Sequence, residues 1–213
     1  MSAKRRAETM AENRAKLIAA ARKAFAAQGY AAASMDALTA QAGLTRGALY
    51  HNFGDKKGLL AAVVNQIDGE MAARAQAVGA AAGAASGPSA GAGAASADDA
   101  WQGMLAEGAA YIEMALDPEV QRIVLLDGPA VLGDPSHWPS QDSCLKRTRQ
   151  AVERLIASGL LKPVDAEAAA RLLTGAALNA ALWIAASDDP QAVLPKAVEA
   201  FRALAEGLLA EPA

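Results

Sequence analysis

Residues 34–60 constrain the fold more than any other stretch of this chain, because two short helical patterns stand there on either side of a tight turn. Ser34 can cap the first helix, since its hydroxyl can accept a backbone N–H that has no partner inside the helix. Gly43 stands where that helix should stop, and glycine takes the left-handed conformation of a helix C-terminus without steric cost. Thr45 can then cap a second helix that runs to about Phe53. The pattern predicts a helix-turn-helix, whose second helix enters the major groove of DNA.

The side chains of the second helix favour the same interpretation. Leu49 and Phe53 are four residues apart and should face the core. Arg46 can make two parallel hydrogen bonds to guanine, and Gly47 would let the backbone approach a base closely. For Arg46 taken alone, an ordinary solvated face is the alternative. We expect these residues, together with one from the following helix, at or near DNA: Ser34, Thr45, Arg46, Gly47, Tyr50, His51, Asn52 and Lys56.

The helix that follows adds an independent argument. Asp55 can cap it, and Lys56 and Lys57 stand in its first turn. Cations are unfavourable at that end of a helix unless an anion docks beside the free backbone amides. The two lysines therefore predict a phosphate contact. Side chains that simply extend into water are the alternative, at a cost of roughly tenths of a kcal/mol.

The segment resembles the DNA-binding domain of the tetracycline-repressor (TetR) family in two respects. These are the run AGLTRGAL at 42–49 and the spacing Tyr50-x-x-Phe53-x-x-Lys56-x-x-Leu59. A preceding helix over about 12–28, closed by Gly29-Tyr30, completes the similarity, which covers roughly residues 12–75. The resemblance implies an all-α fold, with an N-terminal three-helix helix-turn-helix DNA-binding domain and a larger C-terminal helical domain for ligand binding and dimerisation.

Charge divides the chain in a way that fits this plan. Residues 1–77 carry 11 Lys+Arg against 6 Asp+Glu, whereas the remainder carries 9 against 17. A basic N-terminal part is attracted to the phosphates of DNA and an acidic remainder is repelled, so this charge distribution orients a molecule toward DNA. We expect a DNA-binding domain over 1–77, with a fourth helix at about 55–77 as connector. A flexible Ala/Gly/Ser linker over 78–97 and a helical domain over 98–213 should follow. Lys4-Arg5-Arg6 either reaches the minor groove or lies in solvent.

The last two helical patterns, at about 165–186 and 191–210, are the expected dimer surface. The first is apolar around most of its circumference, so it must be buried on more than one side. One side can be the core and the other a partner, and the resemblance implies a bundle of these two helices from each subunit. A purely internal core helix is the alternative, and both can hold. A charge at Ala181 is expected to break such a dimer.

A pocket for a small-molecule effector is implied by the resemblance alone. Side chains of these types at helical spacing are more often plain core than the wall of a pocket. The candidates to line it are Trp101, Met104, Leu105, Tyr111, Leu125, His137, Trp138 and Trp183.

The sequence offers no pattern for catalysis, for a metal or for a cofactor. Two histidines and the single Cys144 do not have the spacing of metal ligands, and no nucleophile or phosphate-loop motif is found. One cysteine cannot form an internal disulfide, which fits a reducing cytoplasm. Neither a signal peptide nor a membrane span, which needs about 18 or more strongly apolar residues, is expected.

These observations predict a cytoplasmic, ligand-responsive transcriptional regulator. It should be a repressor that binds a palindromic DNA operator as a homodimer and is released by a small molecule, with no membrane partner and no enzymatic activity. The alternative is an all-α enzyme or a helical ligand carrier that retains a DNA-binding-like head. A gel shift at two salt concentrations separates these classes.

Overall fold

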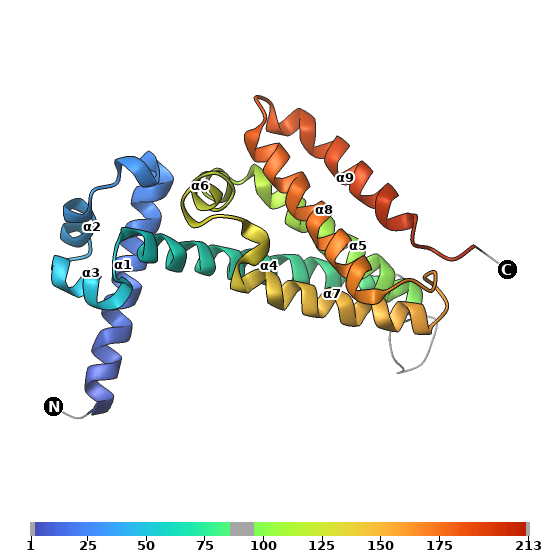
Figure 1. Ribbon diagram of the computed structural model, residues 1–213, viewed down its shortest axis with the longest axis horizontal. Coiled ribbons are helices and arrows are strands. Elements are labelled where there is room, and N and C mark those ends of the chain that lie inside the picture. The colour runs from blue at the N-terminus through green and yellow to red at the C-terminus, as the bar shows by residue number, and fades with distance from the viewer. Residues whose placement is uncertain (1–2, 86–95, 212–213) are drawn as a thin grey trace. The chain divides into compact units, whose positions relative to one another are not determined.

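The computed structural model of the chain describes residues 3–85 and 96–211, which form helices joined by short connections (Figure 1). The expected all-α class is confirmed, since the described ranges contain no strand and their only β-type pairing is an isolated bridge between Leu161 and Leu209. The chain forms two compact units. One holds the residues up to Asp68 together with Asp117–Pro135, and the other holds Gly69–Leu116 with the residues from Ser136 on. The stretch Asp117–Pro135, which we expected within a domain over 98–213, therefore belongs with the N-terminal helices.

The first unit buries one apolar side of each of its N-terminal helices. Of the two residues expected to face the core of the helix-turn-helix, Leu49 is buried but Phe53 is only half-buried, and Leu38 of the first helix of the motif is buried with Leu49. Phe25 of the preceding helix is fully buried with them, as is Leu59 of the following one. The helices concerned are α1 (Ala3–Ala32), α2 (Met35–Gln41), α3 (Arg46–Phe53) and the first part of α4 (Lys56–Ala85).

A later segment of the chain packs on α1 through charged contacts. Its π-helical stretch, η2 (Val120–Asp127), contacts α1, and the short α6 (Gly128–Leu132) that follows contacts η2. Arg22 donates two hydrogen bonds of 2.7 Å to the carboxylate of Glu119. The backbone N–H of Tyr30 donates to Asp127 at 2.7 Å.

Gly29 marks the end of regular geometry in α1. Its φ of +77° breaks the helix at the expected Gly29-Tyr30 position. A Cβ at residue 29 would lie 1.8 Å from Nη2 of Arg122, so the guanidinium occupies the space that a side chain would need. The positive φ is what requires glycine at this position, and the Arg122 side chain fills the space that its missing Cβ leaves.

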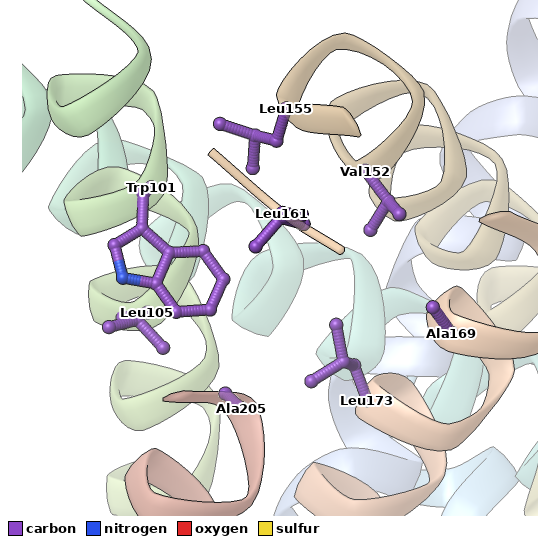
Figure 2. Packing of buried hydrophobic residues seen from close by; sticks show 8 residues of the cluster. All are labelled: Trp101, Leu105, Val152, Leu155, Leu161, Ala169, Leu173 and Ala205. Atoms are coloured by element: carbon purple, nitrogen blue, oxygen red, sulfur yellow. The ribbon is translucent and has the colours of Figure 1, made fainter. Parts of the chain in front are cut away.

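The second unit is built around α5, whose N-terminus carries a capping box between Ser96 and Asp99. Helices α7, α8 and α9 contact α5 and bury an apolar cluster with it (Figure 2). The helices are α5 (Ala97–Glu113), α7 (Pro139–Ala157), α8 (Ala166–Ala186) and α9 (Pro190–Glu206), with short 3₁₀ turns at η1 (Met114–Leu116) and η3 (Pro135–His137). The cluster consists of Trp101, Leu105, Val152, Leu155, Leu161, Ala169, Leu173 and Ala205.

The fourth helix is longer than expected, because α4 continues to Ala85 rather than ending near residue 77. Its last turns pack against α5 at close range. A Cβ at Gly103 would lie 2.8 Å from the carbonyl oxygen of Gly79, and one at Gly83 would lie 2.9 Å from the carbonyl oxygen of Asp99. Glycines let the two backbones touch, so the beginning of the expected 78–97 linker is part of a packed helix. Residues 86–95 of that linker lie outside the described part of the chain.

Helix α8 differs from expectation in a second way. We expected no segment with the length and composition of a membrane span, yet α8 meets both criteria among the described residues. Alanine and leucine make it apolar, and it contacts α5, α7 and α9. Leu173, Ala181 and Ile184 are among the residues it buries, so it supplies much of the core of this unit.

Candidate nucleic-acid interface

Both predicted caps of the helix-turn-helix are confirmed. The Ser34 hydroxyl accepts the N–H of Ala37 at 3.1 Å, and the Thr45 hydroxyl accepts the N–H of Ala48 at 3.2 Å. Between them Gly43 adopts a φ of +65°, as the turn requires. These local interactions fix where α2 ends and where α3 begins, on either side of the turn.

The outer face of α3 carries most of the predicted DNA-contacting side chains. Arg46, Tyr50 and His51 are all exposed, and Tyr50 retains 53% of its accessible surface although it is largely apolar. Asn52 is only half-buried, and its amide donates to the carbonyl oxygen of Ala48 at 2.8 Å. That bond holds the Asn52 side chain against its own helix and leaves its Oδ1 and its second N–H unused by Ala48.

Gly47 lies on the same exposed face without an internal reason to be glycine. A Cβ at this position would meet only Oγ1 of Thr45, at 3.7 Å, which is an ordinary van der Waals contact. Its helical backbone does not require glycine either, since it lies within α3 with a negative φ. The missing side chain therefore leaves room that the chain itself does not use.

Arg46 is paired with Asp36 across the turn. The guanidinium donates through Nε and Nη2 to the two carboxylate oxygens of Asp36, in a side-on bidentate arrangement. The hydrogen bonds from Arg46 hold the pKa of the Asp36 carboxyl below its ordinary value, and Asp36 in turn raises the pKa of Arg46. Both groups stay ionised near neutral pH, and the pair joins the first turns of α2 and α3.

The two lysines at the start of α4 have different surroundings. Asp55 accepts the N–H of Gly58 at 2.7 Å and caps the helix as predicted. Nζ of Lys56 points back to α1, 3.3 Å from the carbonyl oxygen of Ala31 and 4.4 Å from the centre of the Tyr30 ring. Burial lowers the pKa of Lys56, which the nearby Asp127 partly opposes.

Lys57, by contrast, is exposed at the surface of the first turn of α4. The phosphate contact predicted for this pair of lysines therefore suits Lys57 better than Lys56. Lys56 would have to leave both the Tyr30 ring and the Ala31 carbonyl to reach an anion.

Arg14 of α1 is a residue of this region that the sequence analysis missed. Its guanidinium lies 4.6 Å from the centre of the Phe53 ring and donates to the backbone carbonyl of Asn52 at 3.3 Å. It thus binds the C-terminal end of α3, where carbonyl groups lack helical partners. The contact joins residues 38 positions apart, so no pattern of neighbouring residues predicts it.

The expected basic arm forms the first turn of α1, which begins at Ala3. Arg5 is exposed there, and the side chains of Lys4 and Arg6 lie outside the described part of the structure. The exposure of Arg5 is compatible with both alternatives for this arm, contact with the minor groove and a position in solvent.

The structure gathers only part of the predicted effector-binding set. Trp101 and Leu105 belong to the apolar cluster of Figure 2, and Met104 packs against that cluster. Leu125 belongs to the first unit, and Trp183 is exposed on α8. Of the remaining three, Tyr111 and Trp138 are half-buried and His137 is exposed. As a pocket lining, the set stays a prediction.

A surface depression of about 360 Å³ lies elsewhere in the second unit, and none of the predicted residues lines it. Its walls come from α7 and α8 and are mostly charged or polar. They are Asp142, Ser143, Leu145, Lys146, Arg149 and Glu167.

Comparison with known proteins matches both parts of the chain. The model for bacterial regulatory proteins of the tetR family matches residues 17–63, and the model for the tetracyclin repressor-like C-terminal domain matches residues 101–208. A solved TetR-family transcriptional regulator from Pectobacterium atrosepticum is 48% identical, covers 97% of this chain and 98% of its own, and superposes with a TM-score of 0.80.

More distant structures share the fold. A TetR-family transcriptional regulator from Streptomyces coelicolor is 25% identical over 93% of this chain and 96% of its own, with a TM-score of 0.59. SmeT, the repressor of the multidrug efflux pump SmeDEF in Stenotrophomonas maltophilia, is 20% identical over 93% and 91%, with a TM-score of 0.59. No curated protein matches the chain.

Proposed function

Because the chain belongs to the TetR family of bacterial transcriptional regulators, we propose that it is a ligand-responsive repressor that binds a two-fold symmetric DNA operator as a homodimer. The proposal places it in the cytoplasm, assigns it no catalytic activity and makes a small molecule the signal that releases it from DNA.

The exposed face of α3 is the observation that carries this proposal. Arg46, Tyr50 and His51 project from it, and Gly47 leaves a gap between them. Arginine recognises guanine in the major groove, and a missing side chain allows close approach of a helix to the bases. A helix with only a structural purpose gains nothing from this combination.

The homodimer is supported by a stripe of exposed apolar surface on α8. Leu172 is 75% exposed and Trp183 is 49% exposed, and they lie eleven residues apart, which is three helical turns. Gly175 stands between them with nothing within 4 Å of a Cβ, and on α9 Leu204 is 68% exposed. Large apolar side chains gathered on one helix face are typical of an interface rather than of free surface. A second copy of the same stripe is the partner that two-fold symmetry supplies.

Release by an effector requires one element with two arrangements, biased oppositely by ligand and by DNA. Helix α4 suits this role because it is continuous across the division of the chain at residues 68 and 69. A tilt of α4 would change the spacing of two recognition helices in a dimer, which must match major grooves about 34 Å apart. A coupling of about 1–3 kcal/mol would change operator affinity roughly five- to hundredfold.

The test is selection of DNA from a random pool by the full-length protein, followed by affinity measurements at two salt concentrations. We expect an inverted repeat whose half-sites are about 10 base pairs apart, and binding at least about a thousandfold tighter than to scrambled DNA. Scrambled DNA serves as the control for charge alone. Enrichment of no sequence, with equal affinity for all DNA, would contradict the proposal.

A further inference from the structure

The contact between Asp36 and Arg46 uses only one edge of the guanidinium. Nε and Nη2 donate to the two oxygens of Asp36. A guanidinium has five N–H donors, so the edge formed by Nη1 and Nη2 keeps two parallel donors that Asp36 does not use. Two parallel donors of this kind match the O6 and N7 acceptors that guanine presents in the major groove.

Stability does not account for the pair. The side chains of Arg46 and Asp36 remain 58% and 69% exposed, and ion pairs with this exposure contribute little to folding. Asp36 is favourable in the first turn of α2 without any partner, because a carboxylate suits the positive end of a helix. What the bidentate geometry adds is a fixed orientation of the Arg46 side chain, which would otherwise sample many rotamers in water.

We infer that Asp36 is a specificity-determining positioning residue, which holds the guanidinium of Arg46 so that its free edge reads a guanine. This rests on the proposed function, in which α3 lies in the major groove. Asp36 itself does not contact the base; it lowers the entropy that Arg46 loses on binding and fixes the plane of the guanidinium.

If Asp36 positions Arg46, its removal should change the affinities for random DNA and for the operator in opposite directions. The carboxylate of Asp36 lies on a surface that approaches phosphates, so its charge opposes binding to any DNA. Removing it should therefore strengthen binding to random DNA while weakening binding to the selected operator. A residue needed only for folding would weaken both, and a residue acting only through its charge would strengthen both.

The experiment compares affinities for the selected operator and for scrambled DNA of equal length, at one salt concentration. Asp36→Ala should lower the ratio of the two affinities by about fivefold or more, as part of the discrimination that an Arg–guanine pair supplies. The matched control is Glu12→Ala, which removes the same charge from an exposed site on α1 and should leave the ratio unchanged. In an Arg46→Ala background, Asp36→Ala should lower the ratio no further, because the two residues act as one unit.

A chemical probe identifies the base. Replacing the contacted guanine by 7-deazaguanine removes the N7 acceptor, which should weaken binding of the natural protein but have little effect on Asp36→Ala. If Asp36→Ala fails to fold, Asp36→Asn keeps the size of the side chain and one acceptor oxygen, and it should lower the ratio in part.

Three results would overturn the inference: an unchanged ratio for the folded Asp36 variant, an equal fall in the ratio for Glu12→Ala, or a further fall when Asp36→Ala is added to Arg46→Ala. Failure of the natural protein to select any sequence would instead overturn the proposed function. The two failures are therefore distinguishable in one set of measurements.

Discussion

Glycine has opposite uses in two regions of this molecule, the recognition helix α3 and the crossing of α4 with α5. A Cβ at Gly47 in α3 would meet only Oγ1 of Thr45, at 3.7 Å. At the crossing, a Cβ at Gly103 would lie 2.8 Å from the carbonyl oxygen of Gly79. The first glycine leaves space that the chain does not fill, and the second makes space that a neighbouring helix fills. At Gly47 the unfilled space lies on a face that is available to a partner, whereas at Gly103 the filled space is part of the internal packing.

The exposed stripe of α8 belongs with the unfilled positions, and breaking it should have the largest effect. We expect Leu172→Glu to convert a dimer into monomers, because a buried charge would replace an apolar contact on both sides of the two-fold axis. Operator affinity should fall by about a hundredfold or more, since the two half-sites would no longer be bound together. Sedimentation velocity and operator binding measure the two effects.

Val164→Glu is the control for this change, because Val164 is an exposed apolar residue just before α8 and outside the stripe. It should leave both the dimer and the operator affinity intact. A tight operator complex formed by a monomeric Leu172→Glu protein would contradict the proposed assembly. Ala181, the position chosen from the sequence, is fully buried inside the subunit, so a charge there would damage the fold itself.

The next largest effect is expected at the crossing of α4 with α5, where a neighbouring helix fills the space beside each glycine. Gly103→Ala should lower the free energy of unfolding by about 2 kcal/mol, because the added methyl would push two backbones apart. Gly69→Ala in α4 is the matched control, since nothing lies within 4 Å of its Cβ. It should raise the free energy of unfolding by up to about 1 kcal/mol through helix propensity. Urea denaturation measures the free energy of unfolding of each variant. Equal effects of the two substitutions would show that filled and unfilled glycine positions do not differ.

Gly47→Ala should separate stability from function in α3. The free energy of unfolding should stay constant or rise by a few tenths of a kcal/mol, as expected for alanine in an unobstructed helix position. Operator affinity should fall by about tenfold, a cost of about 1.4 kcal/mol, because the methyl would occupy space meant for DNA. Unchanged operator affinity would show that the gap at Gly47 has no partner.

The two lysines of α4 differ in the same way, because Lys57 is exposed to a partner whereas Lys56 is held by contacts within the chain. Their substitution should have the smallest effects. Lys57→Ala should reduce the slope of log affinity against log salt by about 1, as expected for the loss of one phosphate contact. Lys56→Ala should leave the slope nearly unchanged and affect stability instead, because its ammonium is held by the Tyr30 ring and the Ala31 carbonyl. A change in slope for Lys56 alone would show that this lysine leaves its internal contacts when DNA binds.

Prediction from sequence succeeded where the physics is local. The caps at Ser34 and Thr45 and the turn at Gly43 are decided by residues within a few positions of each other, so the helix-turn-helix could be read directly. The family resemblance then predicted that the rest of the chain forms a helical domain, and the fold and the comparisons confirmed this all-α class.

Contacts between distant residues could not be read in this way. A segment rich in alanine and glycine looks like a linker until its partner is known, which is why the end of α4 was placed too early. Three such contacts depend on how the helices lie against each other, and no spacing in the sequence specifies that. They are the bond from Arg14 to Asn52, the bond from Tyr30 to Asp127, and the pairing of Arg46 with Asp36. Trp101 and Leu105 show the same limit, since an aromatic or leucine suits a pocket wall and a core equally well.

The docking of Asp117–Pro135 on α1 has a consequence for how the protein is made. The bonds from Arg22 to Glu119 and from Tyr30 to Asp127 each join residues 97 positions apart. At about 5–20 residues per second, a ribosome needs on the order of 5–20 s to add that length of chain. The nascent recognition helix therefore leaves the ribosome well before the partners that tie down the end of α1 exist. A transcript cut short before codon 117 would yield a chain that carries every exposed side chain of α3 but none of these ties.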